Sequence, residues 1–252
     1  MKLLSTLSFI LFFLTAPLTA LEVEVEQILD VPPNSLGTFS SSDAAAYASN
    51  DQLLLAFSNG FNLFVLEDNQ WIPLIDEYRT PQYNNQRLLE QSYGVVYLYN
   101  SITSGEFLYY AQIGMIAKEY YRVFVDESGE VQAELVNKEY YDSHLLRYLS
   151  RGWSLENGMQ LLNGLRIELT PLEMGLQAYW PDIVDAEGNK VYRFTDEFSE
   201  AFVEDILTIT ANPSLDRVAM VISFTKECEE AYLKPQTERF RKLVIFKLSY
   251  DE

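Results

Sequence analysis

The sequence predicts an all-β fold of antiparallel hairpins with one short helix. Many short apolar runs are bounded by Gly, Asn, Asp or Ser, which is the pattern of strands joined by tight turns. The chain also carries 17 Tyr and 15 Phe, and such side chains suit the half-buried, pleated surface of a sheet. Helical signals are fewer, so strands dominate the expected fold.

The predicted strands are distributed along the whole chain from residue 52 onward. They are Gln52–Ser58, Phe61–Leu66, Gly94–Tyr99, Glu106–Ala111, Tyr120–Val125, Val131–Val136, Arg166–Leu169, Lys190–Phe194, Asp205–Thr210, Arg217–Phe224 and Leu243–Leu248. Before them, Glu22–Leu29 alternates acidic and aliphatic residues at first, which predicts an edge strand with one solvated face.

The helix is predicted from capping residues. Ser143 is a suitable N-cap and Gly152 lies where a C-terminal glycine is favoured, so the segment between them is expected to be helical. A second helical turn is expected over Phe198–Asp205.

Three acidic turns share one layout, in which an apolar strand enters a polar turn and a second apolar segment returns. Their acidic starts are Glu67, Asp126 and Asp185, each 59 residues from the next, and equal spacing predicts a repeated hairpin. Asp126, Asp185 and Glu187 are also the candidate calcium ligands, because Ca²⁺ binds oxygen ligands from turns. Neither turn has the Asp-x-Asp-x-Asp-Gly order of a known calcium loop, so plain turns are favoured and no metal is expected.

The C-terminal stretch Ile206–Ile222, with its Asn-Pro-x-x-x-Arg turn, is followed by Lys242–Leu248, and together they resemble a blade of a β-propeller. Ala44–Phe57 with Phe61–Leu66 is similar. The resemblance implies a propeller-like fold in which Glu22–Leu29 pairs with the last blade. The middle of the chain lacks a recurring blade signature, and another antiparallel sheet or sandwich is the alternative.

The first twenty residues have the order of a secretory signal: Lys2, an apolar run from Leu3 to Leu14, and small residues ending at Ala20. Cleavage after Ala20 is expected, with Ala16 as the alternative. The apolar run is short of the roughly 20 residues that span a bilayer, so no stable membrane insertion is expected after its removal. Residues 21–252 are then one β-rich domain, periplasmic or secreted.

The net charge and the cysteine content restrict the partners and the cellular compartment that suit this protein. Without the signal, 17 basic and 37 acidic residues give a net charge of −20, which opposes binding to nucleic acid or anionic lipid. Cys228 is the only cysteine, so no internal disulfide forms, which favours a bacterial envelope over an animal secreted domain. Neighbouring acids keep its thiol unreactive.

Few catalytic chemistries fit the remaining residues. His144 is the only histidine, no Gly-x-Ser-x-Gly elbow is present, and no phosphate-binding or dinucleotide-binding loop occurs, so no cofactor is expected. Ser143 and His144 are better explained by helix capping and surface exposure. Paired carboxylates could serve a glycoside hydrolase, and the candidate acids are Asp182, Asp185, Glu187, Asp196 and Glu197.

Aromatic side chains could instead bind a partner. Trp153, Tyr179 and Trp180 are the candidates, with Trp180 expected in an exposed corner before Pro181, although packing in the core is the commoner role. By elimination, the sequence favours an exported, acidic, non-catalytic binding or assembly protein whose partner is a protein. A carboxylate-dependent enzyme acting on polysaccharide is the alternative.

Overall fold

The computed structural model describes residues 21–32, 44–57, 62–75, 94–113, 117–148, 159–171, 179–198, 202–225 and 239–250. These residues form four small sheets in which every strand pairing is antiparallel. The prediction of a mainly antiparallel β fold is therefore confirmed. The expected signal peptide, Cys228 and Trp153 lie outside the described residues.

The four sheets are named A to D, and each strand order below runs across its sheet. Sheet A has the order β1 (Leu21–Asp30), β17 (Arg239–Tyr250), β16 (Arg217–Thr225), β15 (Phe202–Ala211). Sheet B has the order β2 (Ala44–Tyr47), β3 (Leu53–Phe57), β4 (Asn62–Glu67), β5 (Gln70–Ile75). Sheet C has the order β10 (Leu145–Tyr148), β6 (Gly94–Ser101), β7 (Glu106–Ile113), β8 (Ala117–Val125), β9 (Val131–Val136). Sheet D has the order β11 (Met159–Gln160), β12 (Arg166–Pro171), β13 (Tyr179–Val184), β14 (Lys190–Arg193).

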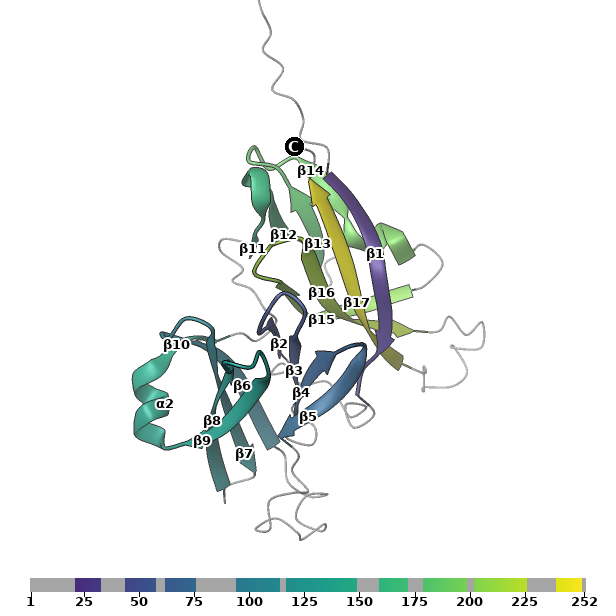
Figure 1. Ribbon diagram of the computed structural model, residues 1–252. Coiled ribbons are helices and arrows are strands. Elements are labelled where there is room, and N and C mark those ends of the chain that lie inside the picture. Colours follow the sequence, from purple (N-terminus) through teal and green to yellow (C-terminus); the bar gives the residue numbers. More distant parts are fainter. Residues whose placement is uncertain are drawn as a thin grey trace, which may run out of the picture.

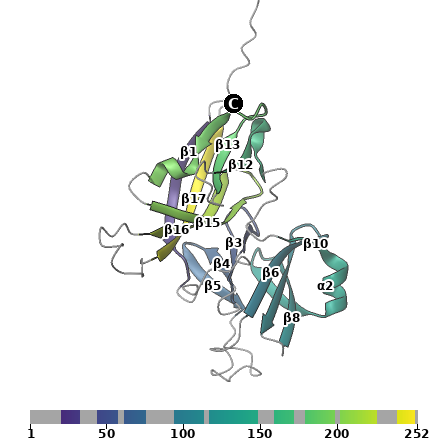
Figure 2. The same ribbon diagram turned by 180° about the vertical axis from the view of Figure 1, so that it is seen from behind.

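The sheets pack face to face in the order D, A, B, C (Figures 1 and 2). One hydrophobic core joins sheets D and A, a second joins A and B, and a third joins B and C; they are called the D–A, A–B and B–C cores. Sheets A and B are thus each covered on both faces, whereas sheet D lies at one end of the stack and sheet C at the other.

The strands β2, β3 and β4 of sheet B are nearly continuous apolar runs. Successive side chains of a strand point to opposite faces, so a strand covered on both faces needs apolar residues at every position. In β3, Leu54 lies in the B–C core while its neighbours Leu53 and Leu55 lie in the A–B core, and all three are almost completely buried. Each such leucine contributes about 2 kcal/mol relative to an exposed one.

The first strand completes the sheet formed by the end of the chain. β1 pairs antiparallel with β17, with Leu21 opposite Tyr250, and forms one edge of sheet A (Figure 1). Its residues alternate between half-buried and exposed along the whole strand, and it lies at a sheet edge as predicted. The solvated face changes along the strand, because Val23 and Val25 pack on the D–A core whereas Leu29 packs on the A–B core. The two ends of the described chain therefore lie side by side.

The three acidic turns all occupy the same place in their sheets. Each turn joins the last two strands of its sheet: β4 to β5 in sheet B, β8 to β9 in sheet C, and β13 to β14 in sheet D. The hairpins predicted from the 59-residue spacing are confirmed. The first turn differs from the others, because Asp68 and Asn69 form a two-residue turn with positive φ at both positions.

The predicted helix is misplaced. The one α-helix in the described part of the chain is α2 (Lys138–His144), and Asn137 caps it by accepting a hydrogen bond from the Tyr140 backbone N–H at 2.7 Å. Ser143 lies in the last turn of α2, where its hydroxyl donates to the Tyr140 carbonyl oxygen. The residues after His144 form β10, because they pair with the free edge of β6.

Other local predictions need smaller corrections. The helical turn predicted over Phe198–Asp205 is wrong for the residues of that range that the structure describes, because Phe198 ends a short 3₁₀ helix, η6 (Phe194–Phe198), and β15 begins at Phe202. A second 3₁₀ turn, η5 (Leu162–Gly164), precedes β12. The strands β2, β5, β10, β11 and β13 were not predicted as strands. Alanine, which forms most of β2, is uncommon in strands, and polar residues or a proline interrupt the apolar pattern of the others. Within the described residues, no helix combines the length and apolar character needed to cross a membrane.

Candidate functional site

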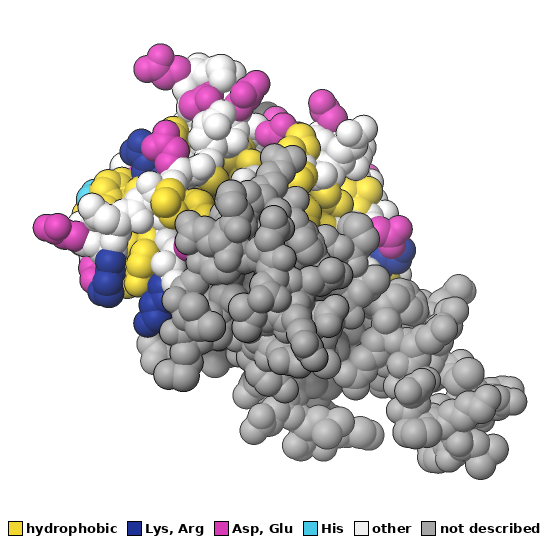
Figure 3. Space-filling model, turned by 90° about the horizontal axis from the view of Figure 1, so that it is seen from below, with side chains coloured by type: hydrophobic (Ala, Val, Ile, Leu, Met, Phe, Trp, Pro, Cys, Tyr) yellow, Lys and Arg dark blue, Asp and Glu magenta, His cyan; other side chains and the backbone are white. Residues whose placement is uncertain are grey.

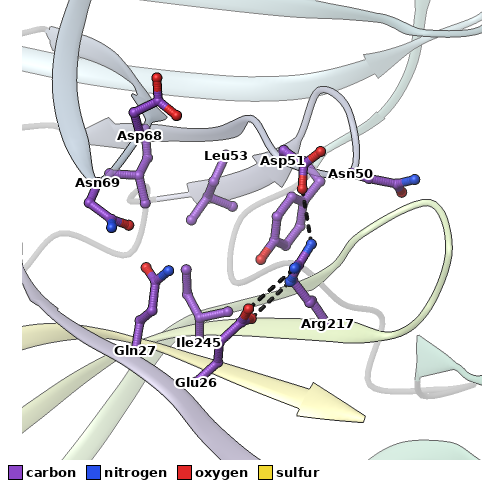
Figure 4. Close-up of a pocket in the computed structure, with 11 residues that line it drawn as sticks. Glu26, Gln27, Asn50, Asp51, Leu53, Asp68, Asn69, Arg217 and Ile245 are labelled. Atoms are coloured by element: carbon purple, nitrogen blue, oxygen red, sulfur yellow. Dashed lines mark hydrogen bonds and ion pairs between the residues drawn. The ribbon is translucent and has the colours of Figure 1, made fainter. Parts of the chain in front are cut away.

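A polar pocket of about 300 Å³ opens where the edge of sheet A meets the turns of sheet B (Figure 4). Residues from sheet A form one wall and residues from sheet B face them. The lining consists of Glu26, Gln27, Tyr47, Asn50, Asp51, Leu53, Leu66, Asp68, Asn69, Arg217 and Ile245. The volume is at the lower end of the range for small-molecule pockets, so it suits one side chain or one small chemical group.

A β-bulge in β1 directs two side chains toward the pocket. The register with β17 shifts between Val25, opposite Phe246, and Gln27, opposite Ile245, and leaves Glu26 as the extra residue. Phe246 lies in the D–A core and Ile245 in the A–B core. The bulge therefore turns Gln27 to the sheet B side, which is a known use of bulges for re-aiming a side chain.

A tight turn before β16 positions Arg217. The amide oxygen of the fully buried Asn212 accepts hydrogen bonds from the backbone N–H groups of Asp216 and Arg217, at 3.1 and 3.0 Å. Its amide nitrogen donates to the Asp216 carboxylate at 2.6 Å. Leu215 adopts a φ of 59°, a left-handed conformation uncommon for leucine, and its carbonyl accepts the Tyr250 hydroxyl proton. This network holds the guanidinium at the mouth of the pocket.

Two turns of sheet B form the facing wall. Asn50 and Asp51 lie in the turn between β2 and β3, and Asn50 accepts a hydrogen bond from the Ser214 backbone N–H at 3.0 Å. Asp68 and Asn69 come from the β4–β5 turn; the Asn69 side chain faces Gln27 across the pocket, whereas the Asp68 carboxylate points away from it (Figure 4). Asn50 thus ties this wall to the turn that carries Arg217.

Arg217 is the one cationic side chain among the pocket residues, and it is already paired. Its guanidinium donates to both carboxylate oxygens of Glu26, at 2.8 and 3.2 Å, and to Asp51 at 3.0 Å (Figure 4). The hydrogen bond to Glu26 is the main cause that raises the pKa of Arg217 above its ordinary value. With Asp68 included, the lining holds three carboxylates and one guanidinium, so its formal charge is −2 at neutral pH.

Two buried polar atoms in the pocket wall have no hydrogen-bond partner among the described residues. They are the Tyr47 hydroxyl and the Gln27 amide oxygen. Tyr47 is only 7% exposed, and burial raises the pKa of its hydroxyl well above the ordinary value, so the group stays protonated and needs an acceptor. Buried polar groups in native proteins are nearly always paired, and an exception indicates a missing water, ion or ligand.

The predicted aromatic site is not assembled by the described residues. Tyr179 and Trp180 lie in β13, where they pair with Pro171 and Thr170, so the backbone is extended there and does not turn a corner. Their side chains and all of Trp153 lie outside the described part of the structure. Their binding role stays a prediction.

The candidate calcium turns use their carboxylates internally. Asp126 accepts hydrogen bonds from the backbone N–H groups of Ser128 and Glu130, and Asp185 does so from Asn189. Hydrogen bonds from the Ser128 and Asn189 side chains are the largest causes that lower the pKa values of these two aspartates. Glu187 is exposed at the tip of the β13–β14 turn. Among the described residues, no group of three potential protein ligands gathers as a metal site.

Three of the five candidate catalytic acids, Asp185 above and two more, have hydrogen-bond partners, whereas Glu187 and Asp196 are exposed. Asp182 accepts two hydrogen bonds of 2.8 Å from the Arg193 guanidinium, and Glu197 accepts one from the Tyr192 hydroxyl. His144 stacks on Tyr140, and its Nδ1 lies 2.9 Å from the Tyr140 carbonyl oxygen, at the end of α2. These contacts give Asp182, Glu197 and His144 structural roles.

Sequence reasoning missed the pocket residues, although two signals pointed to them. The Asn-Pro-x-x-x-Arg turn marked Arg217, and the acid-aliphatic alternation of β1 holds through Glu26 and breaks at Gln27, beside the bulge. Tyr47 could not be recognised, because its unpaired hydroxyl depends on residues from three distant segments. No protein-family model matches this chain, and no curated protein matches it either.

Proposed function

We propose that this chain is an exported, acidic, non-catalytic binding protein of the bacterial envelope, and that it recognises a cationic partner protein. The observation that carries the proposal is the pocket between sheets A and B, which combines a net negative lining with two unpartnered buried polar atoms. Unpaired groups of this kind are suited to a ligand and contribute nothing to stability without one.

The surface charge supports the same function. Asp and Glu side chains lie around the described part of the face seen from below, with Lys and Arg between them (Figure 3). The whole chain carries 37 acidic and 18 basic residues. A field of this sign raises the rate of encounter with basic partners and opposes binding to nucleic acid.

The hydrolase alternative receives less support from the described acids. Asp182 is held by Arg193 and Asp185 by its own turn, so neither is available as a nucleophile or base in the present arrangement. In the pocket, both oxygens of Glu26 are held by Arg217. A glycosidase needs one of two facing carboxyl groups protonated and the other free.

The binding proposal is tested by capture from bacterial envelope extract, with the immobilised protein at about 50 and 300 mM NaCl. We expect a partner retained at low salt and lost at high salt, because exposed charges are screened over roughly 6–14 Å in that range. The double variant Glu26→Gln/Asp68→Asn should lose the partner. Glu187→Gln removes an exposed acid from sheet D and should retain it. Capture that is insensitive to salt and to the double variant contradicts the proposal.

A propeller-like arrangement is the second part of the proposal. It is supported by the face-to-face order D, A, B, C and by β1, which adds the outermost strand to the sheet formed by β15–β17. In such a fold the first strand holds the ends of the chain together. Deleting Leu21–Leu29 should then destroy the cooperative urea transition of the whole domain, and a transition of undiminished steepness and midpoint would contradict this role.

A further inference from the structure

We infer that the pocket between sheets A and B receives one basic side chain, an Arg or Lys of the partner protein. The inference rests on the proposed binding function and specifies what is bound and where. It is carried by the charge of the lining together with the unpartnered hydroxyl of Tyr47, which is more than nine-tenths buried.

The hydrogen-bonding capacity of the lining favours a ligand that donates. Arg217 uses its guanidinium on Glu26 and Asp51, and this leaves the Gln27 amide oxygen as a buried acceptor without a donor. Asp68 lies on the opposite side of the pocket, and its exposed carboxylate stands at the rim, directed away from the interior (Figure 4). Ammonium and guanidinium groups carry three and five N–H donors and no acceptor, so they match acceptors placed on several sides.

The Tyr47 hydroxyl has a different role. Because it remains protonated, it can donate only to an acceptor, such as a backbone carbonyl oxygen of the peptide that carries the basic side chain. Its own oxygen can at the same time accept an N–H. A peptide can therefore both accept a hydrogen bond from the Tyr47 hydroxyl and donate one to its oxygen. A simple metal cation offers no acceptor to the hydroxyl proton.

Size and shape support a side chain more than a larger ligand. A pocket of about 300 Å³ can hold one extended side chain and the peptide group next to it, but not a longer segment. Its floor includes Leu53, Leu66 and Ile245, which are almost completely buried and can contact the methylene groups of an Arg or Lys stem. The charged end then lies among the carboxylates.

The test is a nuclear magnetic resonance titration of the purified protein with acetyl-Gly-Arg-Gly-amide. Its neutral counterpart contains citrulline, which has the same shape without the charge. The arginine peptide should bind with a Kd of roughly 1–10 mM, in keeping with one side chain, and shift the resonances of the pocket residues. The citrulline peptide should bind at least about fivefold more weakly.

Variants connect the binding to the pocket. Asp68→Asn and Tyr47→Phe should each weaken the arginine peptide about three- to fivefold, because each removes one charge or one hydrogen bond. The control Glu187→Gln removes one negative charge from the β13–β14 turn, as Asp68→Asn does from the pocket, and should leave the Kd unchanged. A lysine peptide should follow the same pattern.

Three outcomes overturn the inference. Equal affinity for the arginine and citrulline peptides would mean that the pocket is a water-filled polar cavity. Tighter binding of spermidine than of the peptide would assign the site to a free polyamine and not to a protein. Capture of an envelope partner that is unaffected by Tyr47→Phe and Asp68→Asn would leave the binding function standing and place it elsewhere. If no partner is captured, the peptide titration still tests the pocket by itself.

Discussion

Two arginine–carboxylate clusters of this protein have similar chemistry and different surroundings. In sheet D, Asp182 and Arg193 face each other on adjacent strands and form two hydrogen bonds of 2.8 Å. In the pocket, Arg217 also binds a carboxylate with two hydrogen bonds, yet Tyr47 and Gln27 beside it present polar atoms without partners. The Asp182–Arg193 pair has its hydrogen bonds formed in the free protein, whereas the pocket around Arg217 contains polar atoms without partners.

The difference separates stabilising groups from binding groups. A buried charge pair with all its hydrogen bonds formed holds two β-strands in register. Removing one partner leaves the other charge buried and unpaired. An unpaired buried hydroxyl instead costs stability until something binds it. The pocket thus has the energetic character expected of a site that a ligand completes.

The largest effect is expected from Asp182→Ala. The Asp182 side chain is 2% exposed, so its loss leaves the Arg193 guanidinium without its partner in a half-buried position. We expect the free energy of unfolding to fall by about 3 kcal/mol. Urea denaturation measures this, and the double variant Asp182→Leu/Arg193→Met should recover much of the loss, since it removes both charges.

Glu26→Gln is the matched change in the pocket, because it alters the carboxylate of a similar pair. The side chains of Arg217 and Glu26 are 30% and 26% exposed, and Arg217 keeps Asp51 as a second partner. The expected loss is at most about 1 kcal/mol. A loss as large as that of Asp182→Ala would show that the pocket cluster is structural, which would erase the distinction between the two regions.

The fold was predictable where the pattern of apolar residues within one strand is enough to identify that strand. The apolar runs of β3 and β4 and the alternation of β1 are local signals, so these three strands were found. The predicted position of the helix was wrong because Ser143 and Asn137 are both good N-cap residues. Only the pairing of Leu145–Tyr148 with β6 decides between them. That pairing joins residues more than forty positions apart.

The site was less predictable for the same physical reason. Asp126 and Asp185 were correctly interpreted as turn residues, since a carboxylate that bonds the next few N–H groups is a local feature. The pocket combines β1, the β2–β3 turn, the β4–β5 turn and the start of β16. Among 37 acids, no local pattern shows which three will share a cavity.

The smallest change in the molecule gives the most direct test of the pocket. Tyr47→Phe removes one oxygen and leaves the buried ring, and urea unfolding is compared with and without acetyl-Gly-Arg-Gly-amide at neutral pH. Without peptide, the variant should be as stable as the parent or up to about 1 kcal/mol more stable, because an unpaired buried hydroxyl is lost. At ten times its Kd the peptide should stabilise the parent by about 1.4 kcal/mol, and the variant clearly less at the same concentration. A variant that is destabilised without peptide, or that gains as much from peptide as the parent, would contradict the assignment of Tyr47 to ligand binding.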